Sequence, residues 1–167
     1  MPFQYNIMEG LPEGNVLNSI AALVALVFND GPILRVEEVE QYYRNNKVSI
    51  PWVEEAKQHH RNMVVICFDG DCLVGFKMGY QIKSKEFYSW LGGVRPDYRN
   101  RGIASELMIM QHNWCKDNGY ESIRTETMNR FRNMLILNLR HGYNVTGTYT
   151  TREGDTKIIL EKPLVDS

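Results

Sequence analysis

Several features that would direct an interpretation elsewhere are scarce in this sequence. Its three cysteines are odd in number and lack a Cys-x-x-Cys spacing, so we expect neither a disulfide framework nor a metal site. No Gly-Lys-Ser or Gly-Lys-Thr occurs, which excludes a Walker P-loop, and no Gly-x-Gly-x-x-Gly supports a Rossmann dinucleotide site. The formal net charge of -1 argues against a nucleic-acid binder that relies on a large basic surface.

Long hydrophobic runs are also lacking. The longest apolar run near the N-terminus covers residues 20–28, which is too short to span a bilayer, and no basic leader precedes it. We therefore expect no membrane segment and no signal peptide, and we expect the reducing cytoplasm as the compartment. The length of 167 residues, with 43% hydrophobic and 23% charged residues, predicts one globular domain over residues 1–167.

Hydrophobic periodicity and turn residues predict alternating strands and helices. Strands are predicted over residues 3–8, 62–68, 72–80, 87–94, 122–127, 143–150 and 157–162. Helices are predicted over residues 15–28, 36–45, 51–60 and 130–140, and from residue 103 to the Asn118-Gly119 pair. This order of elements indicates a protein of the α/β (α+β) class with a central sheet.

The segment over residues 92–105 is the most informative part of the chain. It leaves a predicted strand, passes a proline, crosses a basic turn and enters an amphipathic helix. A helix N-terminus attracts phosphate because its first backbone N–H groups are unpaired and positively polarised. Gly102 and Ala104 allow a close approach to the backbone, and Arg99 and Arg101 add charged donors. The pattern indicates a pyrophosphate site; the alternative is an ordinary basic loop before a surface helix.

Residues 99–104, Arg-Asn-Arg-Gly-Ile-Ala, resemble the Arg/Gln-x-x-Gly-x-Gly/Ala signature of the GCN5-related N-acetyltransferases, the GNAT superfamily. The order of the predicted elements is also that of a GNAT domain. The resemblance implies a mixed, mostly antiparallel sheet of about seven strands, flanked by helices. It also implies that the sheet splays between its fourth and fifth strands, where acetyl-CoA lies. The residues expected to contact acetyl-CoA are Gly92, Gly93, Val94, Arg99, Asn100, Arg101, Gly102, Ile103, Ala104 and Ser105.

The activity that the resemblance implies is acetyl transfer from acetyl-CoA to a primary amine, directly within a ternary complex and without a metal. The acceptor is a small molecule or a peptide or protein N-terminus. Neither a membrane nor a nucleic acid is an expected partner, and a homodimer stays open. The alternative is a non-catalytic CoA-binding regulatory or interaction domain, because Tyr88 and Asn138 stand where family members often have catalytic side chains.

Candidates for acid–base chemistry lie on the strand before the basic turn. Alternation places Glu86, Tyr88, Trp90 and Gly92 on one face of this strand. Tyr88 stands where some histone-type GNAT enzymes have a glutamate base, so Glu86 could replace that base directly or through water. Glu126 on the next strand is a second candidate. The alternative for each carboxylate is a solvated surface charge.

The next predicted helix resembles a second family segment, with its Gly142-Tyr143 ending matched. The tyrosine usual in this segment, a proposed acid for the departing thiolate, is replaced by Asn138. An amide can donate a hydrogen bond to sulfur but is no useful proton source, and the alternative is a helix-surface amide. The position of the family's coenzyme-contacting asparagine is Phe131 here, with Asn129 and Asn133 on either side, and we assign this contact to Asn133.

Three further groups of residues are a glycine pair, a histidine pair and a set of aromatic side chains. Gly92 and Gly93 suit a β-bulge that pairs with the pantetheine arm, as the resemblance implies, or they make room for a neighbouring side chain. His59 and His60 are expected at the surface, at the end of a helix. Six aromatic residues line an acceptor pocket or belong to the core; they are Tyr42, Tyr43, Trp52, Tyr80, Tyr88 and Trp90.

Overall fold

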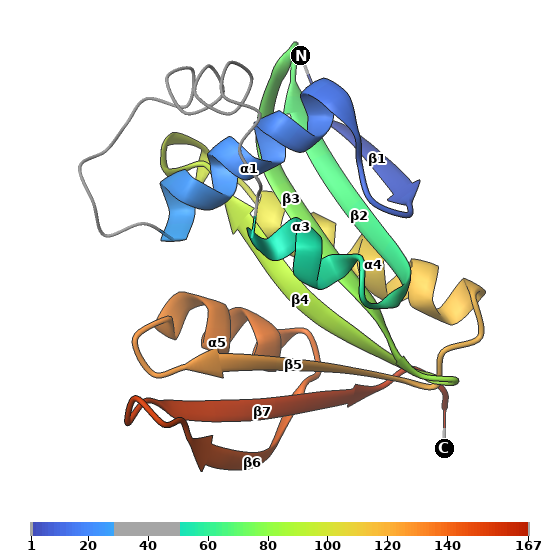
Figure 1. The fold of residues 1–167 in the computed structure, drawn as a ribbon, viewed down its shortest axis with the longest axis vertical. Coiled ribbons are helices and arrows are strands. Elements are labelled where there is room, and N and C mark those ends of the chain that lie inside the picture. Colours follow the sequence, from blue (N-terminus) through green and yellow to red (C-terminus); the bar gives the residue numbers. More distant parts are fainter. Residues whose placement is uncertain (1, 29–50, 167) are drawn as a thin grey trace.

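The computed structural model describes residues 2–28 and 51–166 (Figure 1). Its strands are β1 (Gln4–Glu9), β2 (His60–Asp69), β3 (Cys72–Lys83), β4 (Glu86–Val94), β5 (Ser122–Met128), β6 (Asn144–Thr150) and β7 (Thr156–Pro163). Its helices are α1 (Gly14–Phe28), α3 (Pro51–Ala56), α4 (Ile103–Asp117) and α5 (Arg132–Arg140), with the short 3₁₀ helix η1 (Pro96–Tyr98). The helix predicted over residues 36–45, with Tyr42 and Tyr43, lies outside the described residues.

The strands form one seven-stranded sheet in the order β1-β2-β3-β4-β5-β7-β6. Neighbouring strands are antiparallel except β4 and β5, which run parallel. The sheet is therefore mixed and mostly antiparallel, and the predicted fold class is confirmed.

β4 and β5 pair only over their first residues. Their parallel ladder ends at Tyr88 and Arg124, whereas the strands continue to Val94 and Met128. Beyond the ladder the two strands diverge, as Figure 1 shows. We refer to the opening between residues 89–94 of β4 and residues 125–128 of β5 as the split. The predicted splay between the fourth and fifth strands is confirmed.

Helices cover both faces of the sheet (Figure 1). α4 packs on one face through buried residues such as Ile103 and Leu107, because its apolar residues recur every three or four positions. α1 packs on the other face, where Leu23 belongs to the same hydrophobic cluster as Phe76 of β3. No helix in the described parts of the chain is long and apolar enough to cross a membrane.

The predicted alternation along β4 holds up to Trp90, which lies with Tyr88 beside Tyr80, and is wrong for Gly92. Ser89 and Leu91 pair with consecutive residues of β3, so Trp90 between them is an inserted residue that forms a β-bulge. Gly92 therefore does not share a face with Tyr88, because their partners on β3 point to opposite faces. The bulge precedes the glycine pair instead of containing it.

Candidate active site

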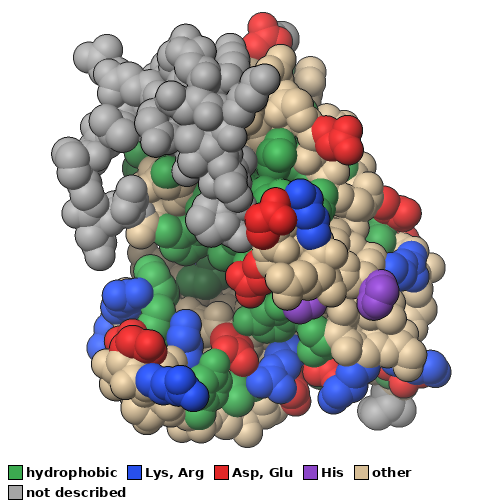
Figure 2. Space-filling model, viewed as in Figure 1, with side chains coloured by type: hydrophobic (Ala, Val, Ile, Leu, Met, Phe, Trp, Pro, Cys, Tyr) green, Lys and Arg blue, Asp and Glu red, His purple; other side chains and the backbone are tan. Residues whose placement is uncertain are grey.

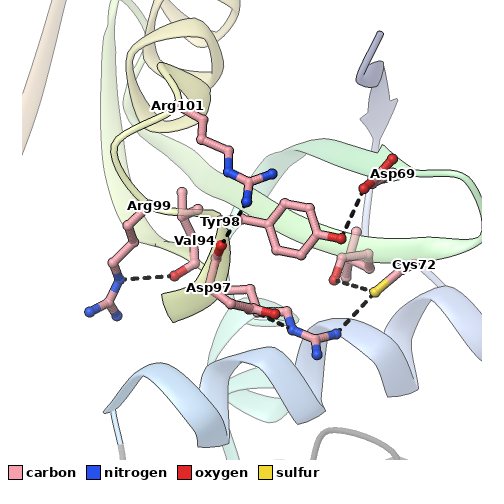
Figure 3. Close-up of polar contacts among 9 residues, drawn as sticks. Asp69, Cys72, Val94, Asp97, Tyr98, Arg99 and Arg101 are labelled. Carbon is pink, nitrogen blue, oxygen red and sulfur yellow. Dashed lines mark hydrogen bonds and ion pairs between the residues drawn. The ribbon is translucent and has the colours of Figure 1, made fainter. Parts of the chain in front are cut away.

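Two residues with positive φ shape the basic turn between β4 and α4 (Figure 3). Asn100 has a φ of 61° and Gly102 a φ of 80°. A Cβ on Gly102 would meet no atom within 4 Å, so the backbone conformation favours glycine there, not a lack of space. Backbone N–H groups in such a turn can form a concave site for an anion.

α4 begins at Ile103 without a capping side chain. Its N-cap is Gly102, which offers none. The N–H of Glu106 donates to the Gly102 carbonyl oxygen at 3.0 Å. The first-turn N–H groups of Ile103, Ala104 and Ser105 come before this bond, so they are the groups that an α-helix leaves for an anion.

Side chains at the end of β2, at the start of β3 and in and just before η1 fix the basic turn (Figure 3). The Tyr98 hydroxyl donates to Asp69 Oδ2 at 2.9 Å. Arg95 donates to Asp97 Oδ1 at 2.8 Å and to Cys72 Sγ at 3.1 Å. No local sequence pattern indicates these contacts, because Asp69 stands 29 residues before Tyr98.

The two arginines of the signature are positioned by their own neighbours. Arg99 Nε donates to the Val94 carbonyl oxygen at 3.2 Å, and Arg101 Nη2 donates to the Asp97 carbonyl oxygen at 3.3 Å. The Arg101 guanidinium also lies over the Tyr98 ring, 4.9 Å from its centroid. Each bond uses one of several guanidinium donors, so further donors are left for a phosphate.

Glu86 and Tyr88 lie where β4 and β5 are still paired. The Glu86 side chain is 16% exposed, and its carboxylate pairs with Lys83 Nζ at 2.9 Å. The Tyr88 and Tyr80 rings are tilted, with centroids 5.3 Å apart. Burial and then the charge of Glu126 raise the pKa of Tyr88, so its phenol is neutral near neutral pH.

Glu126 lies on the β5 side of the split. Its carboxylate accepts hydrogen bonds from Arg124 Nη2 at 3.1 Å and from the Tyr149 hydroxyl at 2.7 Å. Its charge also contributes to raising the pKa of Tyr80 to about 12, after burial and the charge of Glu55. The structure therefore places Glu126 close to the tyrosines of β3 and β4 and holds its carboxylate in one position.

An aromatic group lies on the face that carries α3. Tyr80 packs beside Trp90 with ring centroids 5.6 Å apart, and His59 stacks on Tyr80 with centroids 3.6 Å apart. Figure 2 shows this face hollowed between α3 and the layer of α5 and β5, with hydrophobic side chains inside the hollow. His60 is exposed, as predicted, but it begins β2 and does not end a helix. His59, just after the end of α3 at Ala56, is half-buried against Tyr80.

Asn138 is buried, so the alternative of a helix-surface amide is wrong. It is 2% exposed, and its carbonyl oxygen accepts the N–H groups of His141 and Tyr143, each at 3.1 Å. Asn133 is exposed near the start of α5. The Ser105 hydroxyl is hydrogen-bonded to His141 Nε2, which ties the first turn of α4 to the end of α5.

Side chains from other elements lie against the glycine pair of β4, and the contact is tight only at Gly93. A Cβ on Gly93 would lie 3.0 Å from a methyl group of Val27, and one on Gly92 would lie 3.6 Å from Lys77 Nζ. Lys77 is 8% exposed, and burial lowers its pKa to about 8. Lys77 is not among the predicted site residues. The one feature of the sequence that marks it is its position as the charged residue within the apolar strand over residues 72–80.

A polar group without a partner lies where the split begins. The Ser89 carbonyl oxygen accepts a hydrogen bond from Thr125 Oγ1 at 2.9 Å, but Ser89 Oγ is buried and has no hydrogen-bond partner within the described residues. A buried hydroxyl of this kind can be satisfied by an ordered water or by a polar ligand. The split, the arginines and the open helix end together fit an acyl carrier that bears phosphate. Residues 2–28 and 51–166 contain no group of three or more His, Cys, Asp or Glu placed to hold a metal ion.

A family model described as the acetyltransferase (GNAT) family matches residues 31–142. No curated protein matches the sequence.

Solved structures with a similar fold are acetyltransferases. An aminoglycoside 6'-acetyltransferase type Ii is 18% identical, with 97% of this chain and 99% of that chain covered and a TM-score of 0.70. The ribosomal-protein-S18-alanine N-acetyltransferase from Escherichia coli is 16% identical, with 98% and 96% covered and a TM-score of 0.66. A GNAT family acetyltransferase from Elizabethkingia anophelis with acetyl-CoA bound is 13% identical, with 95% and 97% covered and a TM-score of 0.63. At these identities the likeness shows a shared fold.

Proposed function

The chain belongs to the GNAT acetyltransferase family, and we propose that it transfers an acetyl group from acetyl-CoA to a primary amine, directly within a ternary complex. The observation that carries this proposal is the basic turn with its uncapped helix, which lies at the end of β4 where the sheet is split. A phosphate-binding turn at the mouth of an opening between strands suits a long carrier whose acyl group reaches into the sheet.

Acetyl-CoA binding would use the turn and the adjoining strand. The first-turn N–H groups of α4, with Arg99 and Arg101, would hold the pyrophosphate. The β4 backbone at Gly92, Gly93 and Val94 has no partner on β5, so its polar groups are available to the pantetheine amides. The remaining proposed contacts are with Asn100, Gly102, Ile103, Ala104, Ser105 and Asn133.

Acetyl transfer requires a neutral amine, a polarised thioester carbonyl and a proton for the departing thiolate. Much of the rate comes from holding the two reactants in line and from fixed hydrogen-bond donors. Tyr88, as a neutral phenol at the end of the ladder, would donate one such bond. Glu86 or Glu126 would take the acceptor's proton directly or through water.

The acceptor would enter through the hollow between α3 and the layer of α5 and β5 (Figure 2). This is the face of the sheet on which Trp90 and Trp52 of α3 pack against one hydrophobic cluster, and Tyr80 and His59 lie beside Trp90. Of the similar structures, one is named for an aminoglycoside acceptor and another for an alanine of ribosomal protein S18. We therefore propose either a small-molecule amine or a peptide N-terminus as the acceptor.

Isothermal titration calorimetry with acetyl-CoA tests the proposal. We expect binding by the wild-type protein and its loss in Gly102→Val, because a β-branched residue resists a φ of 80° and would change the turn. Gly154→Val is the matched control: Gly154 has a φ of 89° and open space around it, but it lies in the β6–β7 turn. No binding by the wild type at millimolar acetyl-CoA would contradict the proposal.

A second function is a CoA-binding regulatory or interaction domain without turnover. Tyr88 and Asn138 favour it, because the family often has catalytic side chains at these positions. Thiol release from acetyl-CoA across a panel of amines, peptides and polyamines separates the two functions. Acceptor-dependent release supports the enzyme, and binding without release supports the regulatory domain.

A further inference from the structure

Lys77 is a buried basic residue that the proposed function has not used. It lies on β3 between Phe76 and Met78, which pack in the cluster that contains Leu23 of α1. Because alternate residues of a strand point to opposite faces, the Lys77 side chain lies on the face covered by α4. Only 8% of the residue is exposed.

The Lys77 side chain packs against Gly92 of β4. The two residues are paired across β3 and β4, and a Cβ on Gly92 would lie 3.5 Å from Lys77 Cγ and 3.6 Å from Nζ. Gly92 belongs to the part of β4 that has no partner on β5. The Lys77 ammonium therefore lies against the strand that forms one wall of the split.

The charged and titratable groups that bear on this site are basic. The charge of Lys77 contributes to lowering the pKa values of His112 on α4 and His141 after α5. Lys162 of β7 donates to His112 Nδ1 at 3.1 Å, and His112 Nε2 donates to the Tyr143 hydroxyl at 3.1 Å. Within the described residues no carboxylate forms an ion pair with Lys77.

A buried ammonium without a counter-charge is costly unless it meets an anion or gives up its proton. Acetyl transfer creates an anion in this region, since the sulfur of CoA leaves with an electron pair. We propose that Lys77 stabilises the departing sulfur and donates a proton to it. This inference rests on the proposed function and adds a proton donor to it.

The proton balance of this step is complete. The acceptor nitrogen attacks the carbonyl carbon, the C–S bond breaks, and its electron pair stays on sulfur. The Lys77 ammonium donates a proton to sulfur, which gives the free thiol and a neutral amine. The acceptor nitrogen loses its surplus proton to a carboxylate or to water, and solvent returns a proton to Lys77.

Lys77 suits this task better than Asn138. The Asn138 amide can donate a hydrogen bond to sulfur but cannot release a proton near neutral pH. Burial lowers the pKa of Lys77 to about 8, close to the value of about 8.5 for an ordinary thiol. Proton transfer between groups of similar pKa needs little driving force.

The test measures the thiol pKa of bound CoA, the reaction product, from the ultraviolet absorbance of its thiolate. In the wild-type complex we expect this pKa to lie below that of free CoA. In Lys77→Met we expect it to rise by about one unit or more, a change of about tenfold in the acid dissociation constant. Lys85→Met is the control, because Lys85 is exposed and pairs with Glu121, and it should leave the thiol pKa unchanged.

The outcomes separate this inference from the proposed function. If the wild type does not bind CoA, both are overturned. If CoA binds with the same thiol pKa in the wild type and in Lys77→Met, the role of Lys77 is overturned and acetyl-CoA binding stands. Acetylation of Lys77 itself, detected by mass spectrometry after incubation with acetyl-CoA, also overturns it, because the amide N–H of acetyl-lysine cannot release a proton near neutral pH.

A second measurement does not depend on folding of the variant. In wild-type protein with isotope-labelled lysine, nuclear magnetic resonance follows the Lys77 amine through a pH titration. If its ammonium pairs with the thiolate, its midpoint moves when CoA is added. The same midpoint with and without CoA overturns the inference.

Discussion

The two carboxylates near Tyr88, Glu86 and Glu126, differ in their hydrogen-bond and ion-pair partners. Glu86 has an ion pair with Lys83, whose side chain is 75% exposed, so water competes for this contact. Glu126 accepts bonds from Arg124 and from the Tyr149 hydroxyl, which occupy its two carboxylate oxygens. A base must have an oxygen that can accept a proton. Glu86 has the single, partly solvated ion pair and Glu126 has a hydrogen bond to each oxygen, so Glu86 is favoured for this role.

We expect Glu86→Gln to lower turnover more at about pH 7 than at about pH 9, because alkaline solution supplies neutral amine without a base. Steady-state kinetics at the two pH values measure this ratio. Glu126→Gln is the matched comparison on the other strand. If the loss of turnover in Glu126→Gln becomes smaller at high pH and the loss in Glu86→Gln does not, the base is Glu126. Equal losses at both pH values would assign a binding or structural role to Glu86.

At the scale of elements, the β-bulge depends on a close approach between β3 and β4. Gly79 of β3 pairs with Ser89, next to the inserted Trp90. A Cβ on Gly79 would lie 2.2 Å from the Tyr88 carbonyl oxygen and 2.5 Å from the Phe87 ring. Backbone cannot move aside as a flexible side chain can, so this position admits only glycine without a shift of the strands.

We therefore expect Gly79→Ala to lower the free energy of unfolding by about 3 kcal/mol, as for overpacking of a close-packed interior. Gly147→Ala is the matched control on β6, since its Cβ would lie 3.7 Å from Ile159 Cδ1 in ordinary contact. We expect it to change stability by less than about 1 kcal/mol. Denaturant unfolding of the two variants checks this, and equal midpoints would contradict the proposed strain.

At the scale of the whole molecule, His112 links stability to pH. It lies on α4 and is hydrogen-bonded to Lys162 of β7 and to Tyr143. Burial is the main cause that lowers its pKa to about 3, and the charge of Lys162 is the second. In the unfolded chain the pKa of this imidazole is about 6.5. Between these values the unfolded state binds a proton that the folded state does not, so stability falls as the pH falls from about 6.5 towards about 3.

We expect this histidine to contribute up to about 1.4 kcal/mol per pH unit to the decline in unfolding free energy within that window. Denaturant unfolding at several pH values gives the slope. His112→Gln removes the titrating group and should make the slope smaller by that amount. Parallel slopes for the wild type and His112→Gln would contradict the assignment.

The sequence by itself determined the order of the elements and the position of the basic turn that we propose binds phosphate. Both depend on local patterns: apolar spacing in α4, and Gly102 with its flanking arginines between a strand and a helix. The family signature then implied a splay between β4 and β5, which the ladder ending at Tyr88 confirms.

Only the tertiary structure decided which side chains meet. Trp90 is a bulge because Gly79 lets β3 approach β4, and this insertion moves Gly92 to the face of Lys77. A shift of one residue exchanges the two faces of a strand, so alternation counted along a single strand could not find this pair. The burial of Asn138 likewise depends on packing between α5 and the sheet, which no local spacing encodes.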